Sequence, residues 1–244
     1  DWSSDVCSSD LTFNSRGRVD ANTQAVEFDT VELTARATPE LVQGFSGFTL
    51  DQPAAVSVIL DQLKLPAAAD GASPFPGLGL GGNIKINNPV RLRRAATEDT
   101  PASDTELTLA NVNIRLDGDA IGEELRVTGG LDLNEGRLTL NQAVRSLLQA
   151  DGSVDPDALQ LDGTITGQNL PTEAAALFAE LPEAVTTLIG PGLDTTIATS
   201  LRDGTDQHVT VNARTGGLRL DAAATRRADG VRVERLESDV RLQP

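Results

Sequence analysis

Apolar and polar residues alternate along most of this chain, as they do in a β-strand that buries one face. The stretch from residue 158 to 166 shows the pattern well. Its alternate positions hold Leu159, Leu161 and Ile165 on one side and Gln160, Asp162, Thr164 and Thr166 on the other. An amphipathic helix is predicted next, from Pro171 to Gly190, and the alternation resumes from Leu193 to Leu201. This region therefore predicts a strand, a helix and a second strand.

Alternation elsewhere predicts many more strands. Residues 125–133 alternate without a break, and at ~3.3 Å per residue they predict a strand roughly 30 Å long. Residues 26–37 change phase near Asp29–Thr30, and residues 107–116 change phase at Ala110–Asn111, which predicts a β-bulge. Turns are predicted at residues 117–119, 134–137, 215–217 and 228–230. Strands joined by such short turns favour an antiparallel meander.

Helical spacing predicts helices at two further places. Asp51 is a candidate N-cap for a helix near 51–65, with Val56, Ile59, Leu60 and Leu63 on one face. Residues 141–149 predict a second short helix, and Pro39–Glu40 begins a helical turn. We therefore predict an α+β, mostly β fold: a long curved antiparallel meander, groove-like, with about three short helices packed on one face.

The chain divides into a doubtful start and two units. Residues 1–11 resemble the translation of a sequencing adapter and are expected to be disordered. Residues 12–150 are predicted to form a β-rich unit with the helix near 51–65 and a Pro/Gly-rich loop at 66–82. Residues 151–244 are predicted to form a second strand-helix-strand and meander unit. The last residues echo Thr30–Leu33, so we expect an internal or truncated fragment of a longer repetitive protein.

Composition narrows the classes of partner. The formal net charge is −16, and it becomes −13 without the first eleven residues, which hold Asp1, Asp5 and Asp10. An acidic chain argues against nucleic acid as a partner, because phosphate binding relies on clustered Lys and Arg. Cys7 is the single cysteine and lies in the doubtful start, so cysteine usage leaves the redox compartment undecided. The sequence contains no run of ~18 apolar residues, so it predicts no transmembrane helix.

Candidate catalytic and metal-binding motifs are weak. Gly77–Gly82 spells G-x-G-x-x-G, but a Pro-rich loop precedes it and a strand follows, so dinucleotide binding is not expected. Residues 151–157 resemble a calcium loop without its sixth-position Gly, which favours a solvated turn. His208 is interpreted as an exposed strand residue without other ligands nearby in sequence. We therefore expect no enzyme, no cofactor and no metal site.

The apolar strand faces carry the functional hypotheses. They could all pack against helices in a closed core, or part of them could stay open as a groove for acyl chains. The two interpretations have comparable weight from the sequence. The best-patterned candidates for contact with lipid are Leu125, Val127, Leu131, Leu133, Leu159, Leu161 and Ile165.

Two phrases also resemble a known family. Leu131–Leu138 (LDLNEGRL) and Gly190–Thr196 (GPGLDTT), within a meander interrupted by Pro-started helices, are similar to AsmA-like and TamB-related bacterial envelope proteins of the planctomycete type. The resemblance implies a periplasmic module whose parent is anchored in the inner membrane outside this segment. It also implies phospholipid as a partner, guided along an apolar β-groove in outer-membrane biogenesis. The alternative is a structural or adhesive β-rich repeat of a cell-surface protein with a closed core.

Overall fold

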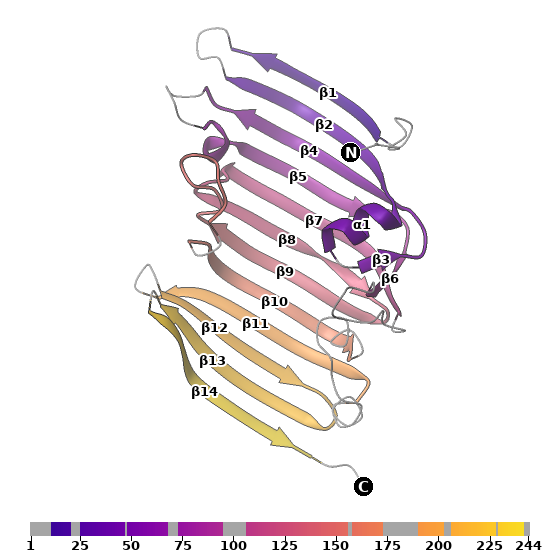
Figure 1. Cartoon of the computed structure of the whole chain (residues 1–244), viewed down its shortest axis with the longest axis vertical. Helices are drawn as coiled ribbons and strands as arrows, with labels where there is room; N and C mark the ends of the chain where they lie inside the picture. Colours follow the sequence, from indigo (N-terminus) through magenta and orange to yellow (C-terminus); the bar gives the residue numbers. More distant parts are fainter. Residues whose placement is uncertain are drawn as a thin grey trace.

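The computed structural model describes residues 11–20, 25–46, 48–67, 73–94, 106–155, 158–172, 190–202, 206–227 and 229–241. Their strands form one 14-stranded sheet (Figure 1). The strands are β1 (Leu11–Val19), β2 (Val26–Ala37), β3 (Phe48–Leu50), β4 (Ala54–Leu65), β5 (Gly79–Ile86), β6 (Val90–Arg94), β7 (Glu106–Ala120), β8 (Glu124–Leu133), β9 (Gly136–Arg145), β10 (Gln160–Pro171), β11 (Gly192–Arg202), β12 (Asp206–Arg214), β13 (Leu218–Arg227) and β14 (Gly230–Val240). The helical elements are α1 (Pro39–Ser46) and the 3₁₀ turn η2 (Phe75–Gly77).

The sheet is an open antiparallel meander. Its strand order is β1-β2-β4-β5-β7-β8-β9-β10-β11-β12-β13-β14, and the short strands β3 and β6 branch from β7. In Figure 1 β1 and β14 lie at opposite ends of the sheet. The prediction of a mostly β, antiparallel meander is confirmed. Because β10 pairs with β9, the sheet runs unbroken across residue 150, where the sequence suggested a unit boundary.

The prediction of about three short helices is not supported. Residues 51–65, predicted as helix, contain strand β4, which pairs with β2 on one side and β5 on the other. Residues 141–145, the first half of another predicted helix, belong to β9 between β8 and β10. In both places two neighbouring strands satisfy the backbone hydrogen bonds that a helix would have made internally. The third helix was predicted from Pro171 to Gly190; Pro171 is instead the last residue of β10, and residues 173–189 lie outside the described residues. The helical turn at Pro39 is confirmed as α1.

Both predicted changes of phase are bulges in the structure. The pairing of β7 with β8 shifts between Ala110 and Asn113, and Asn111 has a positive φ of 51°. The pairing of β1 with β2 shifts so that Asp29 has no direct partner. The turn predicted at 117–119 is wrong, because β7 continues to Ala120 and the hairpin turns at residues 121–123.

Two other predicted boundaries also move. The loop predicted at 66–82 ends earlier, since β5 begins at Gly79. Gly79–Gly82 of the G-x-G-x-x-G match therefore lie in a strand that no helix follows, and the geometry is not that of a dinucleotide loop. Leu11, which we had placed in the disordered start, begins β1, while residues 1–10 lie outside the described residues.

The described residues have little closed core. One buried cluster joins Leu50, Ala54 and Val90, and Val42 of α1 packs against it together with Ile86 and Leu109. The accessible surface is 15331 Å² for a 25.6 kDa chain. A compact globular protein of that mass would expose about 10,000 Å². The excess fits a sheet of one layer, most of which α1 leaves uncovered.

Candidate functional site

One face of the sheet carries a continuous line of apolar residues. The pairing register places one residue from each of twelve consecutive strands in this line, which we call the central apolar row. Its members are Phe13, Leu33, Val58, Ile84, Ile114, Gly129, Leu140, Ile165, Ile197, Val211, Ala222 and Leu236. With strands ~4.8 Å apart, the row follows the sheet for roughly 50 Å.

The rows on either side of it are also largely apolar. One contains Val31, Leu60, Gly82, Leu116 and Val127, and continues through Val209, Ala224 and Val233. The other contains Ala35, Val56, Ile86 and Val112, and then Leu131, Leu138, Gly167, Thr195, Ala213 and Leu220. We call the side of the sheet that holds these rows the apolar face.

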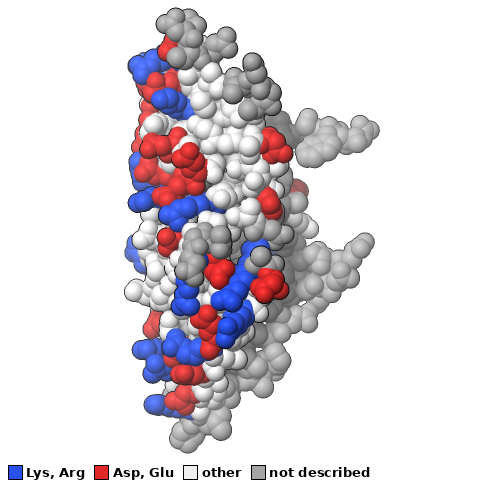
Figure 2. Space-filling model, turned by 90° about the vertical axis from the view of Figure 1, so that its left-hand side faces the viewer, with Lys and Arg blue, Asp and Glu red and all other residues white. Residues whose placement is uncertain are grey.

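Most side chains of the apolar face are only half-buried. This holds for the central apolar row from Leu33 to Ala222, where the described residues provide no second layer. Both ends of the row are exposed, with Phe13 at 62% and Leu236 at 70% of their full accessibility. Seen from one end of the strands, charged side chains gather along one part of the sheet beside a strip of uncharged surface (Figure 2). Within the described residues, the apolar face is thus a long apolar surface that no second layer covers.

Six of the seven predicted lipid contacts lie together on the apolar face. Leu125, Val127, Leu131 and Leu133 come from β8, and Leu161 and Ile165 from β10. The strand between them, β9, supplies their neighbours in register, such as Val144 between Leu125 and Leu161. Leu125 is the buried member of the set, at 9% exposure. Leu159 lies just before β10 and lines a separate cavity.

A polar pair interrupts the apolar face near its middle. Gln142 of β9 and Thr199 of β11 flank Gly163 of β10 in the same row, and Thr199 Oγ1 donates a 3.0 Å hydrogen bond to Gln142 Oε1. The two side chains meet across the strand because Gly163 has no side chain between them. Both are buried, with Gln142 at 8% exposure. Gln142 Nε2 has no hydrogen-bond partner within the described part of the chain.

Sequence reasoning missed this pair because residues 141–149 were predicted as helix. Once they are placed in a strand, Leu138, Leu140, Gln142 and Val144 share one face, and Gln142 is the polar exception. A polar residue at an apolar position of an alternating strand is the signal that would have found it.

The opposite face of the sheet is polar and held by ion pairs between strands. Arg145 of β9 bridges Glu124 of β8, at 2.8 Å, and Asp162 of β10, at 3.4 Å. Hydrogen bonds from Arg126 and Arg145 lower the pKa of Glu124 below its ordinary value. Arg93 of β6 pairs in the same way with Glu106 of β7. The side chains of these pairs are between 30% and 52% exposed, so solvent screens the charges and each pair contributes little to stability.

His208 lies on this polar face, and the prediction that it is exposed is wrong. It is 8% exposed and sits opposite Thr225 of β13. Arg202 approaches its Nε2 at 3.0 Å, and an arginine can only donate, so Nε2 accepts and the ring proton is on Nδ1. Nδ1 then donates to Thr225 Oγ1 at 3.1 Å, and the hydroxyl donates to Glu234 Oε1 at 2.8 Å. The chain of bonds links β11 to β14.

We expect Thr225→Val to destabilise the protein by about 1–3 kcal/mol, because it leaves the buried Nδ1–H of His208 without an acceptor. The hydrogen bond that the Thr225 hydroxyl donates to Glu234 is also the main reason that the pKa of Glu234 lies below its ordinary value. A lowered folded-state pKa gives stability above the ordinary glutamate pKa that is lost as the pH falls. The difference between wild type and variant should therefore shrink below about pH 4. Urea unfolding across pH checks this.

Thr210→Val is the matched control for that experiment. Thr210 lies two residues after His208 on the same face of β12, and it pairs with Ala223 of β13. Thr210→Val should cost clearly less than Thr225→Val at neutral pH. Equal losses from the two variants at every pH would contradict the proposed chain of hydrogen bonds.

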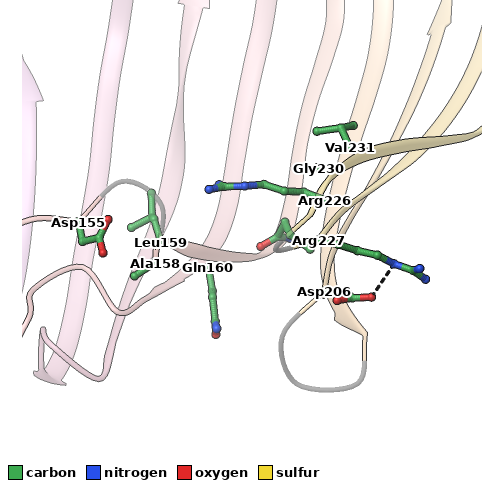
Figure 3. Close-up of a pocket in the computed structure, with 10 residues that line it drawn as sticks. Asp155, Ala158, Leu159, Gln160, Asp206, Arg226, Arg227, Gly230 and Val231 are labelled. Atoms are coloured by element: carbon green, nitrogen blue, oxygen red, sulfur yellow. Dashed lines mark ion pairs between the residues drawn. The ribbon is translucent and has the colours of Figure 1, made fainter.

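A cavity of about 690 Å³ opens where β10 begins and the β13–β14 hairpin turns (Figure 3). Leu159 and Val231 are among its lining residues. Asp206 and Arg227 form a 3.0 Å ion pair at its edge, and Asp155 and Arg226 add one charge of each sign. The lining therefore carries two acidic and two basic side chains, and its formal net charge is zero.

The acidic segment that begins at Asp151 forms a turn. Asp151 Oδ1 accepts hydrogen bonds from the Ser153 amide at 2.9 Å and hydroxyl at 2.6 Å, which lowers the pKa of Asp151. This is an exposed turn of the kind predicted. In the described ranges no three His, Cys, Asp or Glu residues gather so that they could hold a metal ion. None of the described helices is long and apolar enough to span a membrane.

Comparison with known proteins finds no match. No family model matches the chain, and no curated protein or solved structure is significantly similar to it.

Proposed function

We propose that this protein is a non-enzymatic envelope module that binds phospholipid acyl chains along its apolar face and guides them in outer-membrane biogenesis. The observation that carries the proposal is the central apolar row, which crosses twelve strands and stays half-exposed. Burying such a surface against acyl chains gains about 25 cal/mol per Å². A curved sheet with this face inward would make the groove expected from the sequence.

The dimensions fit the ligand. A bilayer core of about 30 Å holds two opposed acyl chains, so one chain spans roughly 15 Å. A row of roughly 50 Å therefore has room for more than one chain laid across the strands. The ion pairs between strands lie on the face opposite the central apolar row, so the surface offered to acyl chains is separate from the charged surface of the sheet.

The resemblance to AsmA-like and TamB-related envelope proteins supports the same ligand. It also supports, as part of the proposal, a module in the periplasm whose parent is anchored in the inner membrane outside this segment. The alternative, a cell-surface repeat with a closed core, receives less support, because the buried cluster around Leu50 and Val90 involves only α1 and strands between β2 and β7 within the described part of the chain.

Lipid extraction from the purified protein tests the proposal. We expect mass spectrometry of the extract to find co-purified phospholipid, and the delipidated protein to take up labelled phospholipid from vesicles. A protein that is consistently free of lipid, and that takes up none from vesicles, would rule the proposal out.

A further inference from the structure

The polar pair on the apolar face points to recognition of a specific part of the lipid. Gln142 is more than nine-tenths buried, and its Oε1 is held by Thr199. Its Nε2 is buried as well, with no acceptor in the described part of the chain. A buried amide donor without an acceptor costs stability, and such groups in folded proteins usually meet water or a ligand.

The surroundings of this amide restrict what the acceptor can be. Val127 precedes Gln142 in its row, and Leu140 and Val144 flank it along β9. Beyond Gly163 and Thr199 the row continues with Val209. A ligand that reaches Nε2 must therefore be apolar around a single hydrogen-bond acceptor. The carbonyl oxygen of a fatty acyl ester, which joins two apolar stretches, has this chemistry.

We propose that Gln142 Nε2 donates a hydrogen bond to the ester carbonyl of a diacyl lipid lying on the apolar face. Thr199 acts as a positioning residue, because its hydroxyl fixes Oε1 and so leaves the amide nitrogen to the ligand. Gly163 provides the space in which the pair meets. This inference rests on the proposed function and adds to it: the face distinguishes ester-linked from ether-linked lipids.

The test is a competition within one sample. Delipidated protein is incubated with vesicles that contain equal amounts of dioleoyl phosphatidylethanolamine and its dioleyl diether analogue, which lacks the two carbonyl oxygens. Mass spectrometry then measures the ratio of the two lipids on the re-isolated protein. One additional hydrogen bond predicts a roughly three- to tenfold preference of wild type for the ester.

Gln142→Leu combined with Thr199→Val removes both polar partners and replaces them with apolar groups, an exchange that costs little stability. This double variant should lose the ester preference and bind the two lipids in equal amounts. Gln168→Leu is the control, because Gln168 is an exposed residue of β10 paired with Arg137, and it should keep the ester preference.

Each contrary result has a distinct meaning. If wild type binds both lipids equally, the hydrogen bond to the ester is overturned while lipid binding stands. If the double variant keeps the ester preference, the recognition lies elsewhere and the assignment to Gln142 is overturned. If neither lipid is taken up, the proposed function fails together with the inference.

Discussion

Gly163→Ala is expected to destabilise the protein by about 4 kcal/mol, which is more than most single substitutions cost. Gly163 has a φ of +145°, which an L-residue adopts only under strain. A Cβ at this position would also overlap the carbonyl oxygen of Asn141 and lie 2.9 Å from the Cα of Gln142. Both atoms belong to β9, which pairs with β10 along its length, so the backbone cannot move aside without breaking the ladder. The midpoint and slope of urea unfolding measure the loss.

Gly230→Ala separates the two contributions. Gly230 has a similar φ of +140°, but a Cβ there would meet nothing within 4 Å. Gly230→Ala should therefore lose stability through backbone strain alone, by about 1–3 kcal/mol. The difference between the variants then measures the clash with β9. Similar losses from both would show that β9 and β10 separate easily at this point, contrary to the pairing described.

Strand β4 shows why alternation predicted the sheet but not all of its strands. On the apolar face β4 presents Val56, Val58, Leu60, Leu63 and Leu65. The pairing with β5 shifts between Leu60 and Gln62, so Asp61 adds one residue to the spacing. A strand with one bulge therefore shows steps of two and three, which resemble the steps of three and four along a helix face. Asp51, which resembles an N-cap just before the strand, then strengthened the incorrect prediction of a helix.

The candidate site was predictable only in part, for a similar reason. The apolar side of β8 and β10 follows from local alternation, and six of seven predicted positions share a face. The central apolar row depends on register across twelve strands, which no local pattern specifies. The burial of His208 depends on Thr225 and Glu234, which lie on β13 and β14 and come close to His208 only once β12 has paired with β13 and β13 with β14. Both the central apolar row and the burial of His208 therefore depend on how strands pair, which the local sequence pattern does not specify.

Ile165→Asp should reduce phospholipid uptake about 100-fold. Ile165 lies in the central apolar row between Leu140 and Ile197, next to the row of Gln142 and Thr199. A carboxylate placed against acyl chains costs about 2.5–3.5 kcal/mol on scales of membrane insertion, and 2.7 kcal/mol corresponds to a factor of 100. The side chain is half-exposed in the described structure, so the charge remains hydrated in the lipid-free protein and the fold should persist. Uptake of labelled phospholipid from vesicles measures the effect, and circular dichroism checks the fold.

Thr164→Asp provides the comparison that ties the loss to one face of the sheet. Thr164 is the preceding residue of β10, is exposed, and pairs with Asn141 and Ala198 on the polar face. Both variants add the same charge to the same strand and carry the same low strand propensity of aspartate. Only the charge at Ile165 would lie beneath a bound acyl chain, so Thr164→Asp should keep uptake within about twofold of wild type, a difference of less than RT. Equal loss from both would mean that the charge acts through the strand's stability, and the central apolar row would no longer identify the binding surface.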